Sequence, residues 1–293
     1  MIIALASLNQ FTSAGLENPW AATGPENVDR TERPKPADPS SLRDMTVMSY
    51  ALSDFSKQLT KNCIPPRPLR LGARLVNEMD AQAHWERVYG TKTPNEMSWF
   101  RPHLETSLFL IERIAGHRSA SIIDVGGGES TLVDDLTCRG YRDVTVLDIS
   151  RTAIEHAKRR LGSASQQVAW LVADITDARL PMHSYDVWHD RAVFHFLTEP
   201  TQRLAYVRQV SSAVKPGGHV IVGAFGPEGP SKCSGLDVIR YDADSLHAEF
   251  GARFRLMQSS KELHHTPFGT TQQFLYCHCI VKSSFSPAQT TGR

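Results

Sequence analysis

Four apolar segments of this 293-residue sequence each end in an aspartate, and these carboxylates are the side chains best placed to do chemistry. They are Asp124, Asp148, Asp174 and Asp190. Short apolar runs are typical of buried strands, and parallel strands bring their carboxyl ends to one edge of a sheet. A carboxylate there can accept hydrogen bonds from both hydroxyls of a ribose. Asp148 follows Asp124 by 24 positions, which is close to the spacing of a ribose-binding acid.

Three glycines directly follow the first of these segments, in the stretch SIIDVGGGES at 121–130. Ile122, Ile123 and Val125 indicate a short buried strand. Gly126, Gly127 and Gly128 then let the backbone turn sharply and approach a ligand closely. An amphipathic helix is expected next, with Gly140 just past its end. Strand, glycine turn and helix predict a nucleotide-type site, although a glycine-rich turn also closes ordinary loops.

The residues around the glycines distinguish between cofactors. A dinucleotide fingerprint needs a further glycine where this sequence has Thr131. The negative charge of Asp124 would also repel a pyrophosphate. Both features favour S-adenosylmethionine, a cofactor with a cationic amino group and no phosphate.

With these residues the chain resembles the class I S-adenosylmethionine-dependent methyltransferases over about residues 80–282. The glycine motif is 124–128, the ribose acid is Asp148, and the acid on the adenine side is Asp174, followed by Ile175. Residues 188–196 (WHDRAVFHF) resemble the fourth motif, and 215–219 (KPGGH) resemble the turn before the fifth strand. The stretch 84–100 is similar to small methyltransferases that include both protein-lysine and small-molecule enzymes.

The resemblance implies an α/β fold: a Rossmann-like, seven-stranded, mostly parallel sheet with helices on both faces and a C-terminal antiparallel hairpin. The hairpin strands are expected at about 253–263 and 273–282. S-adenosyl-L-methionine is the implied cofactor. The residues implied to bind it are Trp99, Asp124, Gly126, Gly127, Gly128, Ser130, Asp148, Ile149, Asp174, Ile175, His189 and Asp190. Packing alone explains Trp99 equally well.

The acceptor side of the site is predicted from chemically capable residues after the fourth and fifth strands. His195 is the candidate general base, because its ordinary pKa lies near neutrality, and a hydrogen-bonded core histidine is the alternative. Candidate substrate-binding residues are Arg191, Cys233, Arg240, Tyr241 and His265, three of them in the long loop 226–241. Cys233 with His264 or His265 lacks the sequence spacing of metal ligands, so no metal is expected.

Composition narrows the class of protein further. Lys and Arg total 32 against 31 Asp and Glu, so no general nucleic-acid footprint is expected. No apolar run approaches the roughly 20 residues that span a bilayer, so no membrane partner is expected either. Five unevenly spaced cysteines indicate neither a disulfide framework nor a paired zinc motif, and a cytoplasmic location is the simplest expectation.

Three parts of the chain are expected. Residues 1–80 are rich in Pro and polar residues over 17–41 and predict a largely disordered extension, with one amphipathic segment near 48–59. Residues 81–283 form the methyltransferase domain, and 284–293 a flexible tail. The predicted function is methyl transfer to a small molecule, with a protein lysine as the alternative acceptor. A protein that keeps the fold but only binds the cofactor would show a damaged glycine motif or would lack the ribose acid. In this sequence the glycine motif is intact and the acid is present. The oligomeric state stays open.

Overall fold

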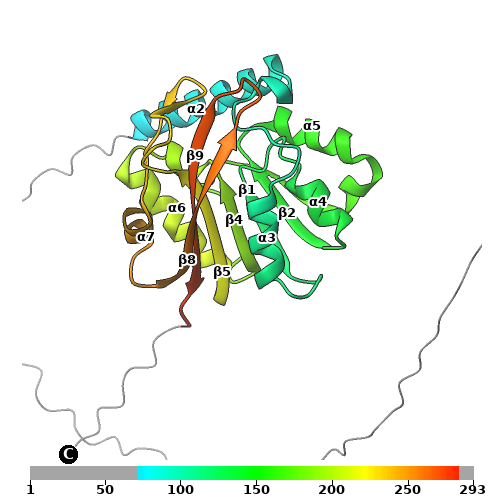
Figure 1. Cartoon of the computed structure of the whole chain (residues 1–293), viewed down its shortest axis with the longest axis vertical. Coiled ribbons are helices and arrows are strands. Elements are labelled where there is room, and N and C mark those ends of the chain that lie inside the picture. Colours follow the sequence, from blue (N-terminus) through cyan, green and yellow to red (C-terminus); the bar gives the residue numbers. More distant parts are fainter. Residues whose placement is uncertain (1–70, 284–293) are drawn as a thin grey trace, which may run out of the picture. The chain divides into compact units, whose positions relative to one another are not determined.

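The computed structural model describes residues 71–283 of the chain (Figure 1). Its first helix, α2, spans Leu71–Thr91 and therefore runs through residue 81, where the catalytic domain was expected to begin. The rest of the expected N-terminal extension, its amphipathic segment and the expected tail lie outside the described residues.

One seven-stranded sheet forms the centre of the fold, in the order β3-β2-β1-β4-β5-β9-β8. The parallel strands are β1 (Ser121–Val125), β2 (Asp143–Asp148), β3 (Val168–Val172), β4 (Tyr185–Arg191) and β5 (Val214–Phe225). The last two strands, β8 (Phe254–His265) and β9 (Thr271–Val281), form the antiparallel hairpin, with β9 paired to β5. The predicted fold class is confirmed. From β1 the chain builds the sheet outward on one side through β2 and β3, and then on the other side through β4 and β5. The strand order therefore reverses between β1 and β4, and folds of this kind bind their ligands at that point.

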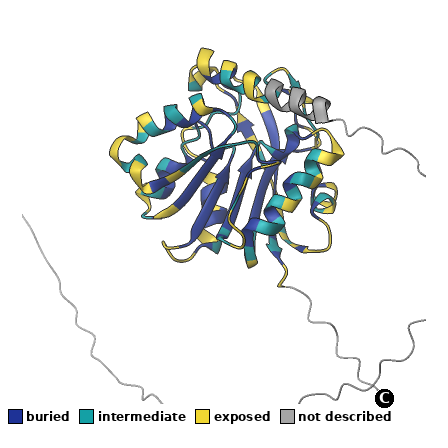
Figure 2. Cartoon of the chain, turned by 180° about the vertical axis from the view of Figure 1, so that it is seen from behind, coloured by how far each residue is buried: buried dark blue, intermediate teal, exposed yellow. Residues whose placement is uncertain are grey.

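Helices cover both faces of the sheet. They are α3 (Glu105–Ile114), α4 (Leu132–Cys138), α5 (Arg151–Leu161), α6 (Pro200–Ala213) and α7 (Ala243–Phe250). Short 3-10 helices are η1 (Pro94–Glu96), η2 (Gly162–Gln167) and η3 (Phe194–Phe196). One core cluster packs α6 and α7 on the sheet, and a second packs α3, α4 and α5 on the other face. Figure 2 shows the resulting layers, with buried strands and helices that expose their outer faces.

Helix ends follow from capping residues in the sequence. The Ser150 hydroxyl accepts from the Ala153 N–H and begins α5, while Asp242 does the same for α7 by accepting from Ser245. Pro200 occupies the first turn of α6, where it leaves no intrahelical hydrogen bond unmade. Along α6, Leu204 is exposed, whereas Tyr206 is buried against the sheet.

A small two-stranded hairpin lies inside the loop 226–241 and was not foreseen. Its strands are β6 (Lys232–Cys233) and β7 (Leu236–Asp237), joined through Gly235 with φ +81°. Two-residue strands carry too few residues for a periodic signal, so the sequence shows only the glycines and prolines around them. Within residues 71–283, every helix is too short or too polar to cross a membrane.

Candidate active site at the carboxyl edge of the sheet

The glycine turn after β1 is held against the neighbouring strand. Gly126 and Gly127 both donate backbone hydrogen bonds to the Leu147 carbonyl of β2, at 2.7 and 3.3 Å. Gly126 has φ +69° and Gly128 has φ +40°, a region that side chains with a Cβ rarely adopt. A Cβ on Gly126 would overlap the Val193 side chain, and one on Gly128 would lie 2.8 Å from Asp148 Oδ2. The motif therefore needs glycine for close approach as well as for backbone conformation.

A cavity opens beside this turn, at the carboxyl ends of β1, β2, β3 and β4. Its lining is mainly apolar and aromatic, with two aspartates, one arginine and one cysteine among the polar members. The lining residues are Ala81, Trp85, Tyr89, Trp99, Val125, Gly126, Leu147, Asp148, Ile149, Ala173, Asp174, Ile175, Arg191, Ala192, Val193, Phe196, Leu197, Gln202, Cys233 and Leu236. The structure thus brings together six residues expected to bind the cofactor and two expected to bind the substrate.

Asp148 is the buried acid of this cavity. Its Oδ1 accepts the Ser150 N–H at 2.8 Å, which fixes the carboxylate at the end of β2. Burial raises its pKa to about 7, with the nearby negative charge of Asp124 adding to the effect and the Ser150 N–H opposing it. Tyr89 lies next to it, and burial together with the charge of Asp148 raises the Tyr89 pKa well above its usual value. Asp148 therefore exchanges its proton near neutrality while the phenol stays neutral.

Helix α2 covers the cavity and is attached to the start of α5 (Figure 1). The Glu86 carboxylate accepts the Arg151 and Thr152 N–H groups at 2.7 and 3.1 Å, and the Ser150 hydroxyl at 3.1 Å. Burial pushes the Glu86 pKa up, but these hydrogen bonds outweigh it and hold the pKa below its usual value. The negative charge of the Glu86 carboxylate also interacts favourably with the positive, N-terminal end of the α5 helix dipole. This contact places Trp85 and Tyr89 over the cavity.

A second, smaller cavity lies beyond the glycine turn and shares Trp99, Gly126 and Arg191 with the first. Ser130 and His189 also line this smaller cavity. His189 is buried between Asp124 and Ser107, with Nδ1 2.7 Å from the carboxylate and Nε2 2.9 Å from the hydroxyl. Asp124 lies behind the turn and lines neither cavity, so the structure gives it a supporting position. Gly127, packed against the Asp124 carboxylate, and Gly128 shape the turn in the same way.

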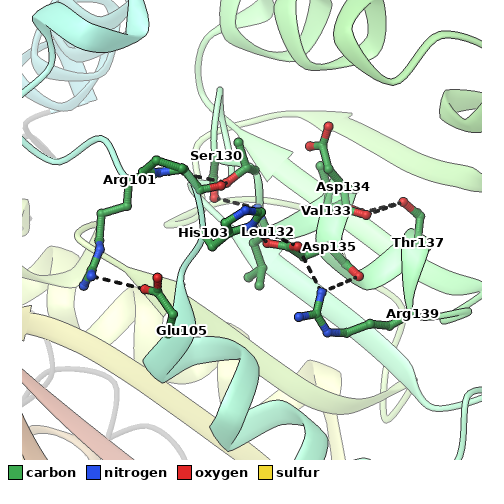
Figure 3. A network of polar contacts seen from close by, with 12 residues as sticks. Arg101, His103, Glu105, Ser130, Leu132, Val133, Asp134, Asp135, Thr137 and Arg139 are labelled. Carbon is green, nitrogen blue, oxygen red and sulfur yellow. Dashed lines mark hydrogen bonds and ion pairs between the residues drawn. The ribbon is translucent and has the colours of Figure 1, made fainter.

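A polar network joins the loop before α3 to the start of α4, beside the glycine turn (Figure 3). The Thr131 hydroxyl donates to the Pro102 carbonyl at 2.8 Å. The Asp135 carboxylate lies 3.0 Å from His103 Nδ1 and 2.9 Å from Arg139 Nη1. Arg101 pairs with Glu105 at 3.2 Å. These contacts fix the segment that carries Trp99 into both cavities.

Arg191 ends β4 and is buried where the two cavities meet. Its Nε donates to the Tyr276 hydroxyl at 3.0 Å, and its Nη1 to the Trp99 carbonyl at 3.0 Å. Cys233 of the β6–β7 hairpin lines the same cavity, and burial raises its pKa to about 11. Arg191 and Cys233, which were expected to bind the substrate, therefore both line the cavity, on the side away from β2 and β3.

His195 is placed in the core, which corrects its predicted role as general base. The side chain is fully buried between Phe196 and Phe225, with ring centroids 4.5 Å from each. Its Nδ1 accepts the Phe225 N–H at 3.2 Å, and burial lowers its pKa to about 3, with Arg191 contributing. It lines neither cavity. The alternative of a core histidine describes this position.

Four other expected site residues also lie away from the cavities. Asp190 is buried and accepts from Val193, Phe194 and the Tyr206 hydroxyl, so it fixes the turn after β4. Tyr241 packs against Phe194 in the core. Arg240 donates to the Pro227 and Gly229 carbonyls, and His265 is exposed. The structure therefore places none of these four side chains in either cavity, because a position in a loop or at a strand end does not fix which way a side chain points.

No cluster of metal-ligating side chains occurs within the described residues. His264, one possible partner of Cys233, is instead held with Nε2 2.7 Å from the Ser98 carbonyl.

The residues of the larger cavity fit S-adenosylmethionine. Asp148 presents a carboxylate for ribose hydroxyls, and Asp174 with Ile175 follows β3 on the adenine side. The space that a Cβ on Gly128 would fill borders Asp148 and Tyr89. Aromatic lining from Trp85, Trp99 and Phe196 suits an adenine ring and a sulfonium cation. A Rossmann-like sheet with this edge cavity is the arrangement of a class I S-adenosylmethionine-dependent methyltransferase.

Comparisons with known proteins agree with that class. A family described as "Methyltransferase domain" matches residues 122–218. The malonyl-[acyl-carrier protein] O-methyltransferase of Anoxybacillus flavithermus is 29% identical over 171 residues, 58% of each chain. The mouse eEF1A lysine and N-terminal methyltransferase is 25% identical over 144 residues, which are 49% of this chain and 20% of the relative. The chain thus spans a fifth to three fifths of the length of these curated relatives.

Solved structures share the fold at low sequence identity. A protein from a study of thioacetal formation during echinomycin biosynthesis matches with TM-score 0.56 and 18% identity, covering 70% of this chain and 94% of that one. The Burkholderia thailandensis 1,6-didemethyltoxoflavin-N1-methyltransferase, solved with S-adenosylhomocysteine, matches with TM-score 0.53 and 15% identity, covering 75% and 93%. The chain is thus similar to methyltransferases over residues 122–218 and shares its fold with these solved structures.

The sequence reasoning missed part of the cavity wall. Phe196, Leu197 and Gln202 follow β4, and Leu236 comes from the β6–β7 hairpin. Trp85 and Tyr89 are four residues apart, which puts both aromatic side chains on one face of a helix, and this spacing was the available signal for a covering role. For Leu236 no comparable signal exists, because an isolated leucine in a loop predicts nothing about its contacts.

Proposed function

We propose that this enzyme transfers the methyl group of S-adenosylmethionine to a small-molecule acceptor. The observation that carries the proposal is the cover over the cavity. Helix α2 forms one wall with Trp85 and Tyr89, and the β6–β7 hairpin contributes Cys233 and Leu236 to another. A largely apolar pocket walled in this way suits a small molecule. A lysine on a folded partner protein needs an open approach instead.

The chain's own residues hold, orient and dehydrate the reactants. Bound S-adenosylmethionine supplies an electrophilic methyl group on a sulfonium sulfur. With the cofactor bound, Asp148 would accept hydrogen bonds from the ribose and Asp174 would lie at the adenine side. Trp85, Trp99 and Phe196 would exclude water from the space around Gly126. Alignment and desolvation are the main contributions that a methyl transfer needs from its enzyme.

The alternative acceptor is a lysine of a partner protein. It is favoured by the relatives named eEF1A lysine and N-terminal methyltransferase, of which the mouse protein matches 49% of this chain. The bacterial relative named as an O-methyltransferase matches more of the chain, at higher identity. This comparison supports an acceptor other than lysine, and the relative's name places its acyl group on a carrier protein.

The proposed setting is a reducing cytoplasm, without nucleic-acid or membrane partners. Cys138, Cys233, Cys277 and Cys279 are all free thiols, which is usual for proteins kept reduced.

Transfer of labelled methyl groups from S-adenosylmethionine into a cell extract tests the proposal. After incubation, the extract is separated by ultrafiltration into small molecules and proteins, with the Asp148→Ala variant as the control. We expect label in the small-molecule fraction that depends on Asp148. Label confined to protein lysines would support the alternative, and no label in either fraction would contradict both.

A further inference from the structure

Arg191 keeps hydrogen-bonding capacity that its described neighbours do not use. Its side chain is 5% exposed, and its Nε and Nη1 donate to Tyr276 and Trp99. Nη2 is buried and finds no hydrogen-bond acceptor among the described residues. The Glu262 carboxylate is 3.8 Å away, too far for a hydrogen bond. A buried guanidinium with unused donors at a cavity wall is a binding site for an anion.

The nearest counter-charge of Arg191 is shared with another arginine. Glu262 lies 3.0 Å from Arg101 and 3.8 Å from Arg191, and Arg101 also pairs with Glu105 at 3.2 Å. A buried charge is costly unless a counter-charge accompanies it. A carboxylate within hydrogen-bond distance of Arg191 would therefore be a closer counter-charge than Glu262.

The surroundings of Arg191 are otherwise apolar. Trp99, Phe196 and Leu236 line the cavity with it, and its guanidinium carbon lies 4.3 Å from the centroid of the Phe274 ring. An anion that enters this space should therefore have an apolar body. Tyr276 on β9 and Glu262 on β8 anchor the arginine on the side of β4 opposite to β2 and β3, whose ends carry Asp148 and Asp174.

None of the titratable residues that line the larger cavity is suited to activate a neutral acceptor on this side. Apart from Arg191 they are Tyr89, Asp148, Asp174 and Cys233. Burial raises the pKa of Tyr89 and that of Cys233, so both stay protonated near neutrality. The two aspartates belong to the ribose and adenine side. An acceptor that is already a nucleophile at neutral pH needs no base, and a carboxylate is one.

We propose that the methyl acceptor is the carboxylate of an apolar small molecule, bound and oriented by Arg191, and that the product is its methyl ester. This inference rests on the proposed function. One carboxylate oxygen forms the new bond to the methyl carbon, and the electron pair of the broken bond stays on sulfur. The negative charge of the carboxylate and the positive charge of the sulfonium are both lost in this step, so no proton is transferred.

Matched pairs of probes test this recognition by binding. Phenylacetate and octanoate are titrated against phenylacetamide and octanamide, with the enzyme saturated with S-adenosylhomocysteine. The variants are Arg191→Met, Arg191→Lys and the control Arg208→Met, which removes an exposed arginine of α6 that lines neither cavity. S-adenosylmethionine is titrated separately into each protein.

We expect the unaltered enzyme and Arg208→Met to bind at least one carboxylate about tenfold or more tightly than its amide, the scale of a charged hydrogen bond. Arg191→Met should remove this preference and Arg191→Lys reduce it, while S-adenosylmethionine affinity stays within about threefold. Mass spectrometry should detect the methyl ester of a preferred carboxylate.

The proposal is overturned if no carboxylate is preferred over its amide, or if Arg191→Met keeps the preference. It is also overturned if Arg191→Met weakens S-adenosylmethionine binding instead, because the arginine would then hold the cofactor's own carboxylate. If Arg191→Met does not fold, the unaltered enzyme and Arg191→Lys decide. Failure of the unaltered enzyme to bind S-adenosylmethionine would count against the proposed function itself.

Discussion

The two sides of the cavity are built in different ways. On the β1–β3 side, the site residues lie at or just after strand ends: the glycine turn, Asp148 with Ile149, and Asp174 with Ile175. On the β4–β8 side, Arg191 depends on Trp99 before α3, Tyr276 on β9 and Glu262 on β8, which come from distant parts of the sequence. The cofactor side is thus encoded locally, whereas the acceptor side exists only after the sheet is complete.

The largest expected effect comes from filling the glycine turn. Gly126→Ala would place a methyl group against Val193 at φ +69°, so left-handed strain of about 1–2 kcal/mol adds to overpacking of about 1–3 kcal/mol. We expect the free energy of unfolding to fall by about 2–5 kcal/mol and cofactor binding to be lost. Denaturant titration and calorimetry measure both.

Gly140→Ala is the matched control for that variant. Gly140 has φ +86°, but no atom lies within 4 Å of the position that an added methyl group would take, so only the strain remains. Equal losses in the two variants would mean that close approach at Gly126 is unimportant.

Replacing Asp148, the proposed ribose-binding acid, should affect the cofactor side of the cavity and leave the acceptor side unchanged. Asp148→Ala is expected to weaken S-adenosylmethionine binding by about 1.5–3 kcal/mol, the scale of hydrogen bonds to a charged group. Asp143→Ala, at the exposed start of the same strand, is the control. Isothermal titration calorimetry measures both. Unchanged affinity in Asp148→Ala would contradict the placement of the ribose at β2.

The raised pKa of Asp148 predicts opposite pH dependences for binding and stability. Because the carboxylate is the form that accepts both hydroxyls, S-adenosylmethionine should bind roughly tenfold more weakly at pH 6 than at pH 8. Without cofactor, the folded protein holds this proton more tightly than the unfolded chain. The contribution of Asp148 to the free energy of unfolding therefore falls as pH rises from about 4 to about 7.

Asp148→Asn should flatten both profiles, because the amide does not titrate. Calorimetry at each pH and denaturant titration of the cofactor-free protein give the two curves. A profile that keeps its slope in Asp148→Asn would assign the titration to another group.

The smallest effect is expected at the cover of the cavity. Glu86→Gln weakens the hydrogen bonds that attach α2 to α5, a capping interaction of about 1 kcal/mol. Cofactor affinity should fall severalfold, because Trp85 and Tyr89 then cover the cavity less of the time. Glu155→Gln, an exposed change on α5, should leave the affinity unaltered. Equal affinities in both variants would mean that α2 holds its place without Glu86.

The same contrast explains what the sequence could predict. The strands of the sheet and the helix starts at Ser150 and Asp242 follow from apolar runs and capping residues, whereas the antiparallel hairpin and the strand order were supplied by the resemblance. Asp148 and Gly126 were found because their chemistry follows directly from a strand end. His195 and Tyr241 were misplaced because side-chain direction beyond a strand depends on packing with distant residues. Leu236 was missed for the same reason.

The cofactor and the acceptor are proposed to bind on different sides of the cavity. A crossed titration separates the two sides: S-adenosylmethionine and phenylacetate are each titrated into Asp148→Ala and Arg191→Met, with phenylacetate measured at saturating S-adenosylhomocysteine. We expect Asp148→Ala to lose only cofactor affinity and Arg191→Met to lose only carboxylate affinity. Loss of both affinities in either folded variant would contradict the division between the two sides.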